Sequence, residues 1–243
     1  MVLNLLTSHT SIRTYKNEKL SKEEVFELIA AAQHAASSHF VQAYSVIWVT
    51  DEQIKKKLGD YSKNPQQMET AGAVFVCCVD FERLRIAGQL NDTLIVTDSA
   101  ENVMVGTIDV ALFAQNLVIA AESKGYGICY IGGVRNNPFE ISELLNLPLN
   151  VFPVFAMTMG VPNEQNGVKP RLPVEAILHE NVYDSEKYKT LLPAYDKTME
   201  EYYASRSSNQ KAANWTKSMA EFLKVPRRTH LKKFLEDKGF SWK

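Results

Sequence analysis

Residues 101–124, ENVMVGTIDVALFAQNLVIAAESK, carry the longest helical pattern in the chain. One stripe of this pattern consists of Val105, Ile108, Leu112, Gln115, Ile119 and Glu122. Further apolar positions around the helix are Met104, Ala111, Ala114, Leu117 and Val118. A helix that is apolar nearly all round is buried on several sides. We therefore predict either the central helix of an α+β domain or an element of a dimer interface, with Gly125 as a left-handed C-terminal cap.

Four short runs rich in β-branched and aromatic residues predict strands, at 45–50, 73–80, 128–131 and 151–159. Ser21 and Glu24 form a capping-box pattern, which starts a helix whose apolar face continues to Ala36. Other helices are expected at 51–58, 185–206, 212–223 and 229–238, and a loop at 61–67. These elements predict an α+β fold with a central, largely antiparallel sheet covered by helices.

The final third of the chain has too few apolar positions to form a core of its own. We predict a single domain over residues 1–243, with an α+β core at 1–162. Residues 163–243 are expected to form an extended C-terminal segment that wraps the core or a partner subunit.

Composition excludes several classes of function. The chain has 27 Lys and Arg against 28 Asp and Glu, which gives no electrostatic footprint for nucleic acid or an anionic membrane. The apolar run 108–121 is too short to cross a bilayer, and no signal peptide is visible. Cys77, Cys78 and Cys129 have no metal-ligand spacing, and the adjacent pair would point to opposite faces of a strand. We expect a cytoplasmic protein with buried, reduced thiols and no metal site.

Two cationic stretches suit a phosphate group. The first is His9-Thr10-Ser11-Ile12-Arg13 and the second is Lys169-Pro170-Arg171. Arginine offers a planar fork of donors, lysine a point charge, and serine and threonine neutral donors. Spacing alone is equally typical of solvated surface charges. A third stretch, 130–135 with the sequence YIGGVR, decides between these interpretations because the three together resemble one enzyme family.

That family is the nitroreductase family of flavoenzymes, in its group of oxygen-insensitive NADPH nitroreductases and flavin reductases. The resemblance runs over nearly the whole chain. Its other motifs are Ser37-Ser38 with Gln42, IDVALFAQNLVIAAES at 108–123, GICYIGGVRNN at 127–137, GVKPRLP at 167–173, HEN at 179–181 and YDKTMEEYYASR at 195–206. The resemblance implies an intertwined homodimer with FMN bound at the interface by residues of both chains.

The resemblance also implies the site residues. For FMN these are His9, Thr10, Ser11, Arg13, Ser37, Gln66, Gln67, Tyr130, Ile131, Gly132, Gly133, Lys169 and Arg171. Arg206 and Lys211 match positions that hold the adenosine phosphates of NADPH. No protein side chain is expected to be catalytic, because hydride passes through flavin N5 and the protein supplies orientation and electrostatics. One shared site predicts ping-pong kinetics.

The sequence departs from the family pattern at two places. Thr10 stands where relatives often carry a second arginine, which removes a charge near the cofactor. Pro65 occupies the position of a flavin-contacting glutamine, and Gln66 and Gln67 follow it. There is no G-x-G-x-x-G after a strand, so a Rossmann domain is not indicated.

Three functions stay open from the sequence. The first is two-electron reduction of small aromatic acceptors, namely nitroaromatics, quinones or free flavins, with NADPH as co-substrate. The second is an NADPH:FMN flavin reductase that supplies reduced flavin to a partner. The third is a non-catalytic flavin or redox sensor.

Overall fold

The computed structural model describes residues 2–206 and 214–240, and it divides into two compact units. The core unit comprises residues 1–166 and 228–243, and the second unit is Gly167–Arg227. The expected boundary at 162/163 thus lies at 166/167, and the end of the chain returns to the core unit. Phe234 and Phe240 explain this return, because both are almost fully buried in the main hydrophobic cluster.

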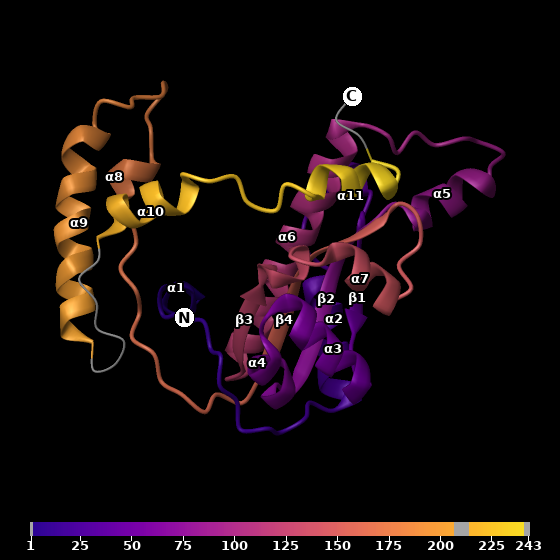
Figure 1. The fold of residues 1–243 in the computed structure, drawn as a ribbon, viewed down its shortest axis with the longest axis horizontal. Coiled ribbons are helices and arrows are strands. Elements are labelled where there is room, and N and C mark those ends of the chain that lie inside the picture. The colour runs from indigo at the N-terminus through magenta and orange to yellow at the C-terminus, as the bar shows by residue number, and fades with distance from the viewer. Residues whose placement is uncertain (1, 207–213, 241–243) are drawn as a thin grey trace. The chain divides into compact units, whose positions relative to one another are not determined.

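A four-stranded antiparallel sheet in the order β1-β2-β4-β3 forms the centre of the core unit (Figure 1). Its strands are β1 (Tyr44–Trp48), β2 (Ala73–Asp80), β3 (Gly127–Ile131) and β4 (Val151–Gly160). All four lie where the sequence predicts them. The antiparallel pairing of every neighbouring pair confirms the predicted fold class.

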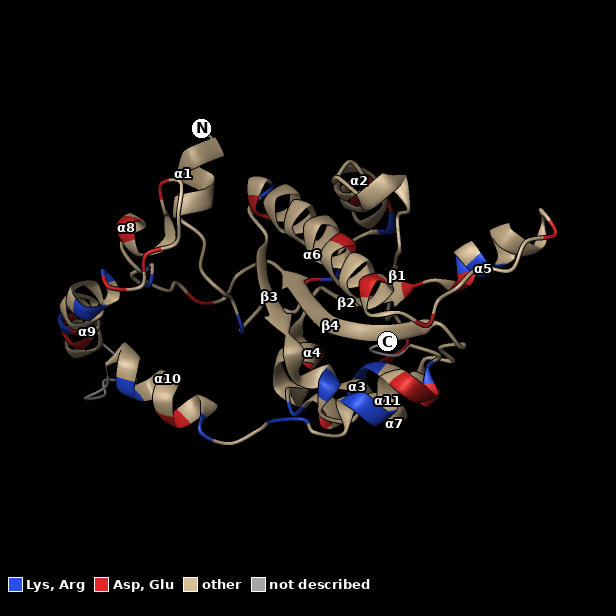
Figure 2. Ribbon diagram, turned by 90° about the horizontal axis from the view of Figure 1, so that it is seen from above, with Lys and Arg blue, Asp and Glu red and all other residues tan. Residues whose placement is uncertain are grey.

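Helices cover both faces of this sheet. On one face lie α2 (Lys22–Ala32) and α6 (Ala100–Ser123), and on the other lie α3 (Glu52–Ser62), α4 (Pro65–Thr70) and α7 (Pro138–Leu144), as Figure 2 shows. Cys77 belongs to the hydrophobic cluster on the first face and Cys78 to the cluster on the second. Both are free and buried, as expected for neighbours on a central strand.

The helix α6 differs from its prediction in burial. Val110, Phe113 and Leu117 face the sheet and are fully buried, whereas Ile108 and Leu112 of the predicted stripe are 51% and 42% exposed. The single chain therefore buries one side of this helix, not several. With 24 residues, α6 is also long and apolar enough to span a membrane by length and composition. This corrects the prediction, made from residues 108–121 alone, that the apolar run is too short to cross a bilayer. Its buried side makes it a core helix in this structure.

The remaining core elements are α1 (Val2–Thr7), η1 (Ser38–Phe40), α5 (Glu82–Gln89), η2 (Gly132–Arg135) and α11 (Leu231–Asp237). The capping box of Ser21 and Glu24 and the left-handed Gly125 are present as predicted. The expected loop at 61–67 was wrong except at 63–64, because α3 continues to Ser62 and α4 begins at Pro65. Proline is favoured in the first turn of a helix, a signal that outweighs the loop-like composition.

The second unit contains α8 (Val174–Ile177), α9 (Tyr188–Ser205) and α10 (Trp215–Leu223). Its small cluster of buried side chains consists of Tyr195, Met199 and Tyr203. The predicted helices of this region are present. The limited cluster agrees with the expectation that this part of the chain builds no large core.

Candidate functional site

The segment that carries His9 to Arg13 lies along the free edge of the sheet. β3 is the last strand in the sheet order, and Ser11 forms a parallel bridge with Ile128 of that strand. The backbone amide of Ile12 donates to the carbonyl of Ile128 at 2.9 Å. Buried Ile12 anchors the segment, so that its polar neighbours are held beside the start of β3.

His9 is fixed by a carboxylate of α6. Its Nδ1 lies 2.5 Å from Oε1 of Glu122, and the two side chains are 28% and 15% exposed. This contact orients the imidazole and leaves Nε2 for a ligand. The sequence placed Glu122 in the helical stripe but gave it no role at the site, because nothing local links two residues that lie 113 positions apart.

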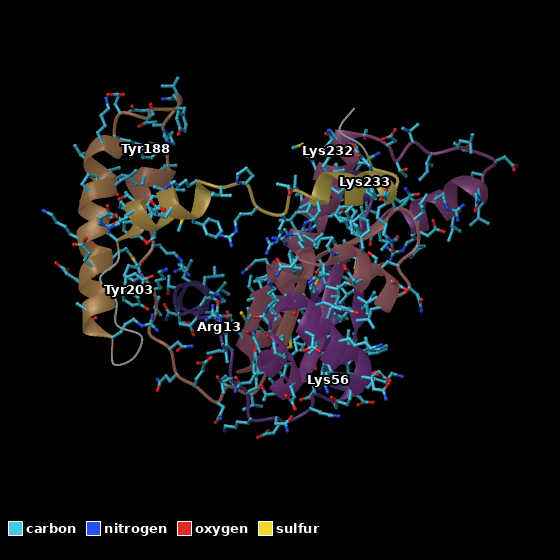
Figure 3. All side chains as sticks on the ribbon, in the orientation of Figure 1. Arg13, Lys56, Tyr188, Tyr203, Lys232 and Lys233 are labelled. Atoms are coloured by element: carbon cyan, nitrogen blue, oxygen red, sulfur yellow. The ribbon has the colours of Figure 1, made fainter. Side chains whose placement is uncertain are left out.

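The backbone around Arg13 is held by the loop that follows β4. The amides of Arg13 and Thr14 donate to Glu164, and Asn166 donates to the carbonyl of Ser11 at 3.2 Å. The side chain of Arg13 is exposed (Figure 3), and its guanidinium makes a long contact of 3.5 Å with the carbonyl of Ser11. Its guanidinium therefore retains donors for an anionic ligand.

A cavity of about 240 Å³ opens beside this segment in the core unit. Its lining includes His9, Thr10, Ile12, Glu122, Tyr126 and Asn166. Thr10 is partly buried here. The lining combines hydrogen-bond donors and acceptors with apolar surface.

Tyr130 and Ile131 at the end of β3 point to opposite faces of the sheet. Tyr130 is 36% exposed, packs edge-on against Phe155 at 4.9 Å and places its hydroxyl 3.5 Å from Gln115. Removal from water raises the pKa of this phenol above its ordinary value. Ile131 is buried against the other face, so only Tyr130 offers a substantial surface to a ligand.

The two glycines of the η2 turn differ in what a side chain at their position would contact. A Cβ at Gly133 would lie 2.1 Å from the carbonyl oxygen of Ser62, which is incompatible with packing. A Cβ at Gly132 would meet only the guanidinium of Arg135, at 3.0 Å. Packing within the protein therefore requires a glycine at 133, whereas no backbone contact requires one at 132.

Gln67 is the glutamine of α4 that points into the protein. It is 8% exposed and donates from Nε2 to Oγ1 of Thr158 at 2.8 Å, whereas Gln66 is exposed. The hydroxyl of Tyr15 contacts the same Thr158 oxygen at 2.8 Å and donates to the carbonyl of Ile12 at 2.7 Å. This network ties Gln67 to the segment of His9 and Arg13. Neither Tyr15 nor Thr158 was identified from the sequence.

Ser37 is not brought to this site within one chain. Its hydroxyl donates to the buried carboxylate of Asp109 at 2.6 Å. Asp109 and Glu122 lie thirteen residues apart on α6, which is about 20 Å along the helix axis. Ser37 and His9 are therefore anchored at well separated points of the same helix.

The remaining predicted residues belong to the second unit. The Lys169 ammonium lies 5.5 Å from the ring centre of Tyr203, and Arg171 donates to the carbonyl of Lys169 at 2.9 Å. The guanidinium of Arg206 lies 5.9 Å from the ring centre of Tyr202. Lys211 lies outside the described residues.

Known proteins are similar to this chain in fold and in sequence over its whole length. Residues 6–161 match the nitroreductase family and residues 169–243 match the C-terminal domain of the same family. The chain is 65% identical to a Cr(VI) reductase from Pseudomonas sp. (strain G-1) over 243 residues, with all of both chains covered. It is 37% identical to an FMN reductase (NADPH) from Bacillus subtilis (strain 168), covering 98% of each.

A solved structure is also similar to this chain over its whole length. NADPH:FMN oxidoreductase from Vibrio harveyi, in complex with NAD+, matches with a TM-score of 0.90 at 31% identity, over 100% of this chain and 99% of that one. The family models together cover most of the chain. The chain therefore belongs to the nitroreductase family.

Proposed function

We propose that this chain is an FMN-dependent NADPH oxidoreductase that reduces small acceptors by two-electron, ping-pong transfer. The observation that carries the proposal is the bridge of Ser11 to Ile128, which holds the cationic segment from His9 to Arg13 at the free edge of β3 in a chain of this family. The relatives named FMN reductase (NADPH) and NADPH:FMN oxidoreductase support both the cofactor and the electron donor.

The residues of the core unit fit FMN. An exposed guanidinium at Arg13 suits a doubly charged phosphate, and the partly exposed ring of Tyr130 suits a flat apolar surface. Gly132 has no side chain at the turn, which permits close approach of a ring edge. We assign the holding of FMN to the residues implied by the resemblance except Gln66, which is exposed, whereas Gln67 points into the protein.

When bound, FMN supplies the hydride chemistry, and the chain's own residues set its surroundings. Arg13, Lys169 and Arg171 supply positive charge, which stabilises a phosphate and the negative charge that a reduced cofactor carries. Glu122 holds the imidazole of His9 in one orientation. Tyr130 stays a neutral phenol over the working range because its pKa is raised, so it adds apolar surface and no charge.

We further propose a homodimer in which each site takes Ser37 from the partner subunit. The separation of Asp109 from Glu122 keeps Ser37 of one chain away from His9 of the same chain. An apolar row on α6, formed by Met104, Ile108 and Leu112, is also exposed at 56%, 51% and 42%. A second copy that covers this row would bury it and complete the site.

Nitroaromatics, quinones and free flavins are the acceptors we propose, in the cytoplasm. Chromate is a further acceptor to include, because the relative at 65% identity is named for Cr(VI) reduction. The alternative of a flavin reductase that supplies reduced flavin to a partner is supported by the FMN reductase relative. Purified protein that holds FMN but consumes no NADPH with any acceptor would instead indicate a sensor.

Binding of FMN to Arg13→Ala tests the cofactor assignment. Loss of one charge-assisted phosphate contact is worth roughly 1.5–3 kcal/mol, or about ten- to a hundredfold in affinity. Lys16→Ala is the matched control, because Lys16 is an exposed cation three residues along the same segment. Titration of the stripped protein by flavin fluorescence measures both. Equal affinities in the two variants would remove Arg13 from the site.

The two half-reactions test the donor assignment. We propose that Arg206 contacts the adenosine phosphates of NADPH, so Arg206→Ala should slow bleaching of the flavin by NADPH by about ten- to a hundredfold in kcat/KM. Reoxidation by a quinone should stay nearly unchanged. Stopped-flow absorbance separates the two, and equal slowing of both would exclude this role. Parallel double-reciprocal lines are expected in steady state, and intersecting lines would exclude the shared site.

A further inference from the structure

A chain of buried hydrogen bonds ends at the side-chain amide of Gln67. Gln67 lies on α4, Thr158 on β4 and Tyr15 on the segment that follows Arg13. Nε2 of Gln67 lies 2.8 Å from Oγ1 of Thr158, which in turn lies 2.8 Å from the hydroxyl of Tyr15. That hydroxyl lies 2.7 Å from the carbonyl oxygen of Ile12. Thr158 and Tyr15 are 0% and 3% exposed, so water does not compete for the bonds between them.

The carbonyl at one end fixes the direction of every donor in this chain. A carbonyl oxygen can only accept, so the hydroxyl of Tyr15 donates to Ile12. A second carbonyl, that of Thr158, lies 3.2 Å away and gives the same direction. A phenol has one proton, and burial raises the pKa of Tyr15, which keeps that proton on the oxygen. The bond between the two hydroxyls is therefore donated by Thr158, and Oγ1 of Thr158 can only accept from Gln67.

This direction determines which end of the Gln67 amide is free. Only the NH2 group of an amide donates, so Nε2 lies toward Thr158 and Oε1 lies on the other side of the amide carbon. No group among the described residues donates to this Oε1. In the same part of the chain, Ser142 Oγ is the one fully buried side-chain polar atom without a partner, so Oε1 of Gln67 keeps access to the surface. Gln67 therefore offers an acceptor to a ligand.

The reversed amide is unfavourable in this chain. Reversal would place Oε1 of Gln67 against Oγ1 of Thr158, with no proton between the two oxygens, because the Thr158 proton is used by Tyr15. Two buried acceptors in contact lose a hydrogen bond and gain none. The buried chain thus holds the amide in one orientation before a ligand arrives, which lowers the entropic cost of binding.

We propose that Thr158 and Tyr15 are positioning residues for the cofactor, which fix the amide of Gln67 so that its Oε1 accepts a hydrogen bond from an N–H of the ligand. The isoalloxazine ring of FMN carries one such group, the imide N3–H, between two carbonyls on its pyrimidine edge. This inference rests on the proposed binding of FMN. Because Thr158 and Tyr15 are buried, both act through Gln67 and not by contact with the cofactor.

Affinity for FMN separates positioning from a general loss of structure. Thr158→Val removes the hydroxyl at nearly constant volume, and Tyr15→Phe removes the acceptor of that hydroxyl. Each should weaken FMN binding by about three- to tenfold, the value of one hydrogen bond, in a fluorescence titration of the stripped protein. Thr158→Ser keeps the hydroxyl and should bind FMN as the parent does. In a Gln67→Leu background, neither Thr158→Val nor Tyr15→Phe should weaken binding further, because both act through the amide.

FMN isotope-labelled at N3 gives a direct signature of the bond. The N3–H proton should exchange slowly with water in nitrogen-edited NMR of the parent and of Thr158→Ser, and this slow exchange should be lost in Thr158→Val and Gln67→Leu. Unchanged FMN affinity in both Thr158→Val and Tyr15→Phe would overturn the inference while FMN binding stands. Weakening of the same size in the Gln67→Leu background would also overturn it, since the effect would then be structural. A purified chain that binds no FMN would refute the proposed function and this inference with it.

Discussion

Substitution of Gly133 by alanine tests why the η2 turn has its glycines. The new Cβ would lie 2.1 Å from the carbonyl oxygen of Ser62 and 3.0 Å from Nδ2 of Asn64. The carbonyl belongs to the last residue of α3, so the turn or the helix end must move by about 1 Å. Overpacking of this kind costs about 1–3 kcal/mol, and contact with backbone places Gly133→Ala at the upper end, about 3 kcal/mol.

Two matched variants make this prediction sharp. Gly132→Ala meets only the end of the flexible Arg135 side chain, and a Cβ at Gly167 meets nothing within 4 Å, so both should lie within about 0.5 kcal/mol of the parent. Urea unfolding followed by far-UV circular dichroism gives the three values. With a slope of about 3 kcal/mol per molar urea, Gly133→Ala should unfold about 1 M earlier. If Gly133→Ala unfolds at the same urea concentration as Gly167→Ala, the packing explanation is wrong.

Three further changes have defined outcomes. Asp109→Ala removes the acceptor for Ser37 and for two backbone amides, so it should lower the free energy of unfolding by about 3–5 kcal/mol in urea titration. Burial raises the pKa of Cys77 to about 12 and that of Cys78 well above its usual value. Neither thiol should therefore react with a disulfide reagent until the protein is unfolded in urea. Rapid labelling of either thiol in the native protein would contradict their burial. Hydrogen bonds from Tyr126 and from the Ser21 cap lower the pKa of Glu24 from 4.5 to about 2. The stabilising effect of the ionised Glu24 carboxylate is therefore present above pH 4.5 and is lost as the pH falls toward 2. Glu24→Gln should show a shallower loss of stability than the parent protein across that interval.

Local sequence signals were sufficient for most of the fold. The β-branched runs marked all four strands, and the Ser21-Glu24 pair marked the start of α2. These signals succeed because each depends on residues within one turn or one strand of one another. The error at 61–67 arose where two local signals conflict, since Pro65 favours the first turn of a helix while its polar neighbours favour a loop.

The site was predictable only as a set of residues, because the contacts that hold them join distant parts of the chain. Ser37 depends on Asp109, His9 on Glu122 and Gln67 on Thr158, at separations of 72, 113 and 91 residues. No periodicity or local motif encodes such pairs. The helix α6 supplies two of the three partners, and its exposed row at Met104, Ile108 and Leu112 lies on the same element. One helix thus covers the sheet, anchors two segments of the candidate site at two separate points along its length, and presents an apolar face outward. An apolar pattern nearly all round the helix satisfies these demands together, which explains why the sequence alone could not separate a core role from a role in dimer formation.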